Sequence, residues 1–142
     1  MISVKTSQLQ KQVLKELRYS FGTVYIFDGF LISEINEGVH FSWEYHGKQM
    51  VEDISCFLGT DGRNIIYISN RIHSYSVVAS DWLKFFKNYY FLKGYYVVEQ
   101  DEQRKINAVI ETMFFNGKIK RFHTLDCAVN FARQVIATSF AI

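Results

Sequence analysis

Four polar residues follow a short apolar strand in the middle of the chain. The predicted strand is Ile65–Ile68, and after it come Asn70, Arg71, Ser74 and Ser76. An unbroken apolar run of this length is typical of a strand buried on both faces of a parallel sheet. Ligands and partners of open α/β sheets bind beyond the carboxyl ends of such strands. We therefore expect these four residues to form an exposed recognition patch.

The two serines of this patch could carry a phosphorylation switch. A phosphoserine adds about −1.5 to −2 charges, and the loop precedes a predicted helix whose free amides favour anions. The guanidinium of Arg71 could pair with the phosphate. The alternative is that Ser74 and Ser76 satisfy backbone amides in a turn, which is the commoner role of loop serines.

Other reactive side chains predict no further chemistry. His40, Glu44 and His46 would share a face of an extended segment, but two histidines and one carboxylate more often form a solvated face than a metal site. Cys127 follows His123, yet most such cysteines are unreactive. Neither a nucleophile–base pair nor a phosphate-binding loop is evident, so we expect no metal, no cofactor, no catalytic residue and no enzymatic activity.

Composition predicts one packed domain. The chain has 142 residues, of which 49% are hydrophobic and 17% aromatic, and its net charge of +2 is too small to predict a nucleic-acid partner. Met1–Arg18 lacks the apolar run of a signal peptide, and no apolar stretch approaches the ~20 residues of a membrane span. Two cysteines without metal-type spacing favour a reducing, cytoplasmic location.

Hydrophobic periodicity predicts an α/β architecture. We expect a helical extension over residues 1–20 and a single α/β domain over residues 21–142. In this domain a β-hairpin turning at Asp28-Gly29 precedes β/α units, and the sheet is mainly parallel and flanked by helices. The segment 39–46 fits both strand and helix and leans towards the extended form. The expected buried core includes Trp82, Phe86, Ile110 and Phe131.

Two segments resemble a known family. Phe30–Gly38 (FLISEINEG) and Asn64–Ser76 (NIIYISNRIHSYS) are similar to STAS domains, the SpoIIAA-like family of sulfate transporters and anti-sigma-factor antagonists, over roughly residues 21–140. The same runs resemble those of short stand-alone STAS-like proteins of Bacteroidota. The resemblance implies the SpoIIAA-like fold and a serine switch that controls binding to a kinase-type regulator. The matching region here, His73–Ser76, lacks the family's aspartate and glycine.

Two functions follow as hypotheses. The first is a non-enzymatic regulatory module that binds another protein through Asn70, Arg71, Ser74 and Ser76; the sequence leaves a homodimer open. The second is a carrier of an apolar small molecule or lipid, because the chain is rich in aromatic residues. An enclosed pocket lined by Phe and Tyr would favour the carrier, whereas a flat or convex loop surface would favour the protein-binding module.

Overall fold

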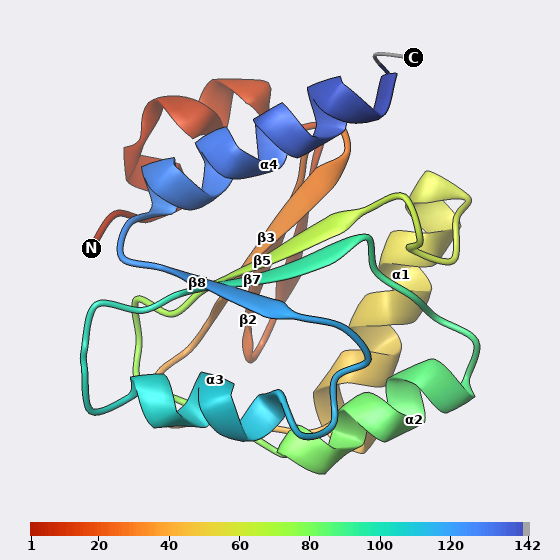
Figure 1. Ribbon diagram of the computed structural model, residues 1–142, viewed down its shortest axis with the longest axis vertical. Helices are drawn as coiled ribbons and strands as arrows, with labels where there is room; N and C mark the ends of the chain where they lie inside the picture. Colours follow the sequence, from red (N-terminus) through yellow and green to blue (C-terminus); the bar gives the residue numbers. More distant parts are fainter. Residues whose placement is uncertain (141–142) are drawn as a thin grey trace.

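A six-stranded mixed sheet forms the middle layer of the protein (Figure 1). The computed structural model describes residues 1–140. The strands lie side by side in the order β1 (Lys15–Tyr19), β2 (Gly22–Ile26), β3 (Phe30–Ile35), β5 (Ile66–Asn70), β7 (Gly94–Val98) and β8 (Ile119–Phe122). The first three are antiparallel, and β3, β5, β7 and β8 run parallel to one another. The expected α/β fold with a mainly parallel sheet is confirmed.

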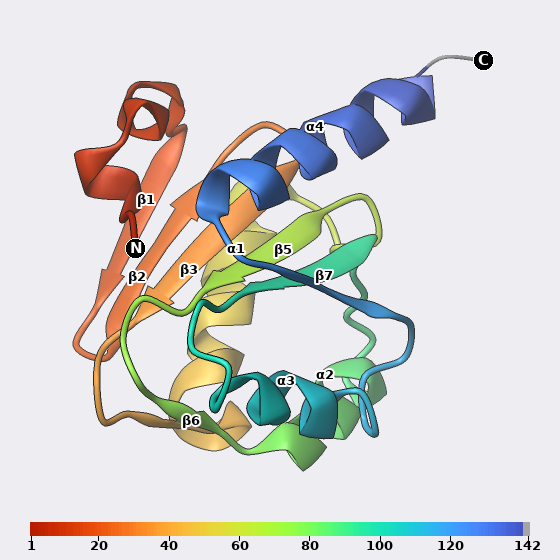
Figure 2. The same ribbon diagram turned by 60° about the vertical axis from the view of Figure 1, so that its left-hand side comes forward.

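The helices cover the two faces of the sheet unequally. The parallel strands follow one another in a single direction across the sheet, and right-handed crossovers then place every connecting helix on the same face. Figure 1 shows α1 (Lys48–Leu58), α2 (Trp82–Lys87) and α3 (Lys105–Glu111) on that face. The opposite face carries α4 (Leu125–Phe140) and two N-terminal 3-10 turns, Val4–Thr6 and Gln8–Gln12, as the turned view in Figure 2 also shows.

Strand alternation divides the core between these two faces. Ile66 and Ile68 of β5 pack with Val4, Leu9 and the apolar stripe of α4. Tyr67, which lies between them in the chain, points to the face covered by α1, α2 and α3. Because register is fixed by the pairing, residues with odd numbers in β3, β5 and β7 share this second face. All candidate chemistry described below lies there.

The N-terminal segment differs from the expected helical extension. Residues 4–12 form the two 3-10 turns, and Lys15–Tyr19 pairs with β2 as an additional edge strand. The expected hairpin at Asp28-Gly29 is present, with Gly29 at φ 85°, so β1 extends it to a three-stranded antiparallel unit. Pairing with an available sheet edge satisfies the backbone of residues 15–19, which the helical spacing of their apolar side chains did not reveal.

The ambiguous segment before α1 contains both kinds of structure. His40–Phe41 forms β4, which pairs in parallel with β6 (Ser76–Val77) in a separate two-stranded sheet. Trp43–Gly47 then winds as a π-helix whose N-cap is Ser42, and it continues into α1. Beside this small sheet, Gly38 N–H donates to the carbonyl of Ser74, so the two segments that carry the family resemblance are in direct contact.

Helix α3 presents the opposite face from the one expected. Its buried residues are Ala108 and Glu111, whereas Ile106, Val109, Ile110 and Met113 are exposed. Ile110 is 43% exposed, so its predicted burial is wrong. Trp82, Phe86 and Phe131 are only half-buried. None of the helices that the structure describes combines the length and the apolar character required to traverse a bilayer.

Candidate functional site

An apolar pocket lies between the sheet and the layer formed by α1, α2 and the π-helix. Its volume is about 110 Å³, and it is partly open to solvent. The aromatic part of its wall includes Trp43, Tyr67, Trp82, Phe85, Tyr90 and Tyr95. Aliphatic side chains of β3 and α1 also line it, among them Leu31, Ile35, Met50, Val51 and Ile54. The pocket is therefore a concave, largely aromatic cavity of the kind that takes small organic molecules.

The floor of the pocket is a row of residues in register across the sheet. Leu31, Tyr67 and Tyr95 are paired neighbours on β3, β5 and β7. The rings of Tyr67 and Tyr95 stack with centroids 5.3 Å apart and an interplanar angle of 7°. Parallel pairing places these side chains on one face, so the flat floor follows directly from the sheet register.

The roof is built from aromatic rings that contact one another, some edge to face and some stacked. Trp43 of the π-helix packs on Phe85 of α2 with centroids 6.3 Å apart, and Phe85 also stacks on Tyr90. Trp82 contacts both Phe85 and Tyr95, which joins the roof to the floor. Such aromatic pairs contribute roughly 0.5–1.5 kcal/mol each beyond their buried area. These contacts therefore help to stabilise the cavity wall.

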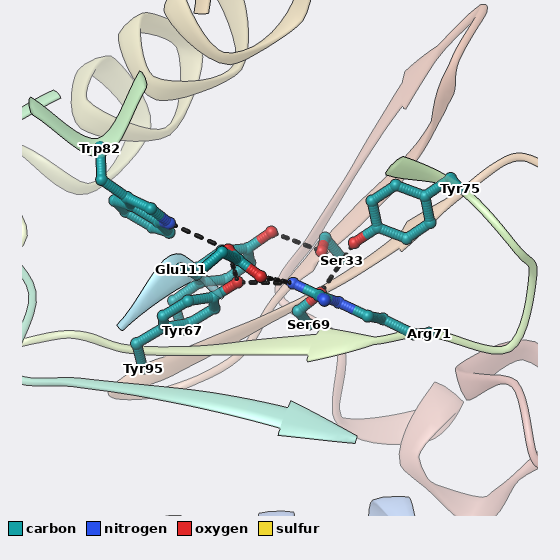
Figure 3. A network of polar contacts seen from close by, with 8 residues as sticks. All are labelled: Ser33, Tyr67, Ser69, Arg71, Tyr75, Trp82, Tyr95 and Glu111. Carbon is teal, nitrogen blue, oxygen red and sulfur yellow. Dashed lines mark hydrogen bonds and ion pairs between the residues drawn. The ribbon is translucent and has the colours of Figure 1, made fainter. Parts of the chain in front are cut away.

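A buried ion pair joins Glu111, which lines the pocket, to Arg71 behind the pocket wall. Arg71 Nη2 lies 2.5 Å from Glu111 Oε2, and the side chains are 5% and 1% exposed. Glu111 Oε1 also accepts hydrogen bonds from Trp82 Nε1 at 2.9 Å and from Tyr95 Oη at 2.7 Å. Figure 3 shows the carboxylate at the centre of these donors. Glu111 thereby connects α3 to α2, β5 and β7.

The network continues from Arg71 to the neighbouring strand residues. Arg71 Nε donates to Ser69 Oγ at 3.1 Å, and Ser69 Oγ lies 2.8 Å from the hydroxyl of Tyr75 (Figure 3). Arg71 Nη2 also donates to Tyr95 Oη at 2.8 Å. The guanidinium carbon of Arg71 lies over the Tyr75 ring, 5.6 Å from the ring centroid. The charge of Arg71 is thus compensated by a carboxylate, hydroxyls and an aromatic face.

Burial controls the ionisation of the two tyrosines on the floor. It raises the pKa of Tyr67 well above the ordinary value of 10.0. The pKa of Tyr95 is raised by burial first and by the adjacent charge of Glu111 second. Both hydroxyls therefore keep their protons near neutral pH. Tyr95 can then donate to Glu111 while it accepts from Arg71.

The structure does not bring the four predicted site residues together in one exposed patch. Asn70 and Arg71 are 1% and 4% exposed, so their predicted exposure is wrong. They are consecutive at the end of β5, and consecutive strand residues point to opposite faces. Ser74 is exposed in the loop after β5, and Ser76 is exposed at the start of β6. Ser76 Oγ lies 2.6 Å from His40 Nδ1.

Asn70 instead holds the N-terminal segment on the far face of the sheet. Its Nδ2 donates to Glu34 Oε2 at 2.9 Å and to the carbonyl of Ile2 at 3.0 Å. The same carboxylate accepts from Val4 N–H and from Ser3 Oγ. Asn70 is therefore a structural clamp in this arrangement, separated by the sheet from Arg71 and the pocket.

Sequence reasoning missed Trp82, Tyr95 and Glu111 as members of one site. The burial expected for Ile110 implies the opposite inward face for this helix, and that face does not include Glu111. A usable signal was the set Ala108, Glu111 and Phe115, which have helical spacing and share a face that contains a single charge. Its partner, Arg71, lies 40 residues earlier in the chain.

His46 is held by a backbone hydrogen bond and by contacts with two phenylalanine rings. His46 Nδ1 accepts from the N–H of Ser42 at 3.0 Å, and the ring packs between Phe21 and Phe41. Burial lowers the pKa of His46. Within residues 1–140 no three histidine, cysteine or carboxylate side chains come together as metal ligands would.

Comparison with known proteins does not assign the chain to a family. No protein-family model matches the chain, and neither a curated protein nor a solved structure matches it. The fold and the pocket thus define the protein only as an α/β domain with a candidate small-molecule site. The resemblance to STAS domains remains a hypothesis.

Proposed function

We propose that the protein binds a small apolar organic molecule in the pocket between the sheet and α1–α2. The observation that carries this proposal is the concave, aromatic-lined cavity, which was the feature expected of a carrier. The polar groups beside the pocket, those of Tyr95, Glu111 and Arg71, form hydrogen bonds with one another. They therefore have their hydrogen-bonding needs met inside the protein, which supports binding over catalysis at this site.

The size of the pocket limits the ligand to a small molecule. Its volume of about 110 Å³ is similar in magnitude to a dry apolar cavity of about 150 Å³ that accepts benzene. A single ring with a short substituent is the appropriate scale. The partly open wall would allow a longer tail to reach solvent.

The test is a titration with 2-phenylethanol, monitored by NMR chemical shifts and calorimetry. Val51 is half-buried on α1 and lines the pocket. Val51→Phe should fill the cavity and abolish binding. The matched control is Val109→Phe, which places the same ring on the outer face of α3, where Val109 is 41% exposed. Binding that survives Val51→Phe, or shifts confined to residues outside the pocket, would contradict the proposal.

A second measurement addresses the natural ligand. Protein purified without organic solvent is extracted, and the extract is examined by mass spectrometry for molecules that co-purify. The wild-type protein should carry an apolar compound that the Val51→Phe variant lacks. Recovery of equal amounts of the compound from the wild-type protein and from Val51→Phe would show that it binds outside the pocket.

A second candidate function is the STAS-like regulatory module, switched by serine phosphorylation. It is favoured by the exposure of Ser74 and Ser76 in the loop after the central strand. A kinase-type regulator in the cytoplasm is the partner that the resemblance implies. Because Arg71 is buried in an ion pair, Arg71→Ala is unsuitable as a surface variant.

The appropriate test of this second function uses Ser74→Asp and Ser76→Asp. Both changes lie at exposed positions and should alter stability by less than about 0.5 kcal/mol. Loss of the protein partner captured by the wild-type chain would support the switch. Capture that is unchanged in both variants would argue against it. Phosphopeptide mapping of the native protein provides an independent measurement.

A further inference from the structure

The charged side chains that line the pocket are all acidic. Asp61, Asp81 and Glu111 contribute to its wall, while none of the described lining residues is lysine, arginine or histidine. Aromatic rings cover much of the remaining surface, and the face of an aromatic ring carries partial negative charge. An occupant of this pocket would therefore meet negative charge from both the carboxylates and the rings.

The three carboxylates differ in how completely they are neutralised. Glu111 is paired with the buried Arg71 at 2.5 Å, behind the pocket wall. Asp61 pairs with Arg63 at 2.7 Å, and Arg63 is 71% exposed. Asp81 has only the N–H of Trp43 at 2.7 Å and the half-exposed Lys84 at 3.4 Å. Asp81, 16% exposed, is thus the least compensated negative charge in the wall.

Asp81 lies next to aromatic residues of the pocket wall. It directly precedes Trp82, and it receives a hydrogen bond from the backbone of Trp43. The ring of Phe85 contacts both tryptophans. A carboxylate beside electron-rich rings in a partly desolvated cavity is the arrangement that recognises an organic ammonium group.

We propose that the pocket selects a small hydrophobic amine in its ammonium form, with its apolar part on the aromatic wall and its charge facing Asp81. This inference rests on the proposed small-molecule function and specifies the ligand class. An organic acid of the same size is disfavoured, because its carboxylate would lose water beside Asp81, and the nearby Lys84 is already paired with Asp81.

The experiment compares three probes that share one ring: 2-phenylethylamine, 2-phenylethanol and phenylacetate. Each is titrated into the full chain at pH 7 and low salt and followed by NMR chemical shifts. The amine should bind on the order of tenfold more tightly than the alcohol, and phenylacetate should bind most weakly. Asp81→Asn should remove the preference for the amine, so that the amine and the alcohol bind this variant within about twofold of each other.

The matched control is Asp126→Asn, which removes the same charge from an exposed position on α4, across the sheet from the pocket. It should leave the ranking of the three probes unchanged. Because the ranking is measured first in the unaltered protein, the inference stays testable even if Asp81→Asn fails to fold.

The outcomes separate this inference from the function on which it rests. If the alcohol binds in the pocket and the amine binds no better, the amine specificity is wrong and the binding function stands. A preference for phenylacetate would overturn the inference in the same way. If none of the probes binds, both proposals fail.

Discussion

Replacing Glu111 by glutamine tests whether the buried ion pair organises the pocket. Glutamine has nearly the shape of glutamate, so the change opens no cavity and isolates the electrostatic effect. It leaves the charge of Arg71 buried without a counter-ion, because both side chains are at most 5% exposed. It also points an amide N–H at one of the donors that now bind Glu111, namely Arg71, Trp82 or Tyr95.

The expected loss of unfolding free energy is about 4 kcal/mol, since breaking a buried ion pair by removing one partner costs roughly 3–5 kcal/mol. Total stabilities of single domains are about 5–15 kcal/mol, so Glu111→Gln would remove a quarter or more of the total. At roughly 3–5 °C per kcal/mol, the melting temperature should fall by roughly 12–20 °C. Urea denaturation followed by circular dichroism measures the free energy.

Two further variants test whether a loss of stability in Glu111→Gln comes from the buried ion pair. Glu52→Gln changes an exposed residue of α1 and should alter stability by less than about 0.5 kcal/mol. The double variant Arg71→Met with Glu111→Met removes both charges and should be more stable than Glu111→Gln alone, because apolar replacement of a whole buried pair is often neutral. A loss below about 1 kcal/mol for Glu111→Gln would refute the reasoning.

Three other expectations test the fold and its ionisable groups. Ile110→Glu should change the unfolding free energy by less than about 0.5 kcal/mol, whereas Ala108→Glu should prevent folding, because Ala108 is buried and Ile110 is 43% exposed. The reverse order of stability in urea denaturation would support the helix orientation expected from sequence. The free energy of unfolding should fall as pH rises above 10.0, because the pKa of Tyr67 is raised in the folded state and the unfolded chain loses that proton first. Tyr67→Phe should weaken this pH dependence in unfolding curves measured between pH 9 and 11. The free energy of unfolding should also fall as pH drops below 6.5, because the pKa of His46 is lowered in the folded state and the unfolded chain takes up the proton first. His46→Gln should weaken this pH dependence between pH 7 and 5. An unchanged pH dependence would contradict the role given to His46.

Features that depend on local chain chemistry could be predicted from the sequence. The Asp28-Gly29 turn needs only a residue able to adopt positive φ, and Gly29 does so. Thr124 caps α4 through its side chain, as its position before Leu125 predicts. The alternation of strands with helices then implies a parallel sheet, because consecutive parallel strands require crossovers. These signals lie within a few residues of the structure they determine.

Features that depend on distant partners required the tertiary structure. The apolar stripe of α3 predicts an inward face, but the sheet offers Arg71 and Tyr95 at that position, and Glu111 satisfies them. A buried charge determines the orientation of such a helix because leaving it unpaired costs more than exposing a few aliphatic side chains. No pattern in a single sequence connects residues 71 and 111.

The recognition patch illustrates the same limit within a single strand. Asn70 and Arg71 are adjacent in sequence, and the end of β5 was expected three residues before Arg71, where the chain would be free to present both. Pairing with β7 extends the strand through Asn70 and sends the two side chains to opposite faces. The sequence determined that a central strand carries polar residues at its carboxyl end. The neighbouring strands and helices decided that Asn70 binds the N-terminal segment and that Arg71 pairs with Glu111 behind the pocket wall. The physical reason is that the length and register of a strand depend on hydrogen bonds made by its partners.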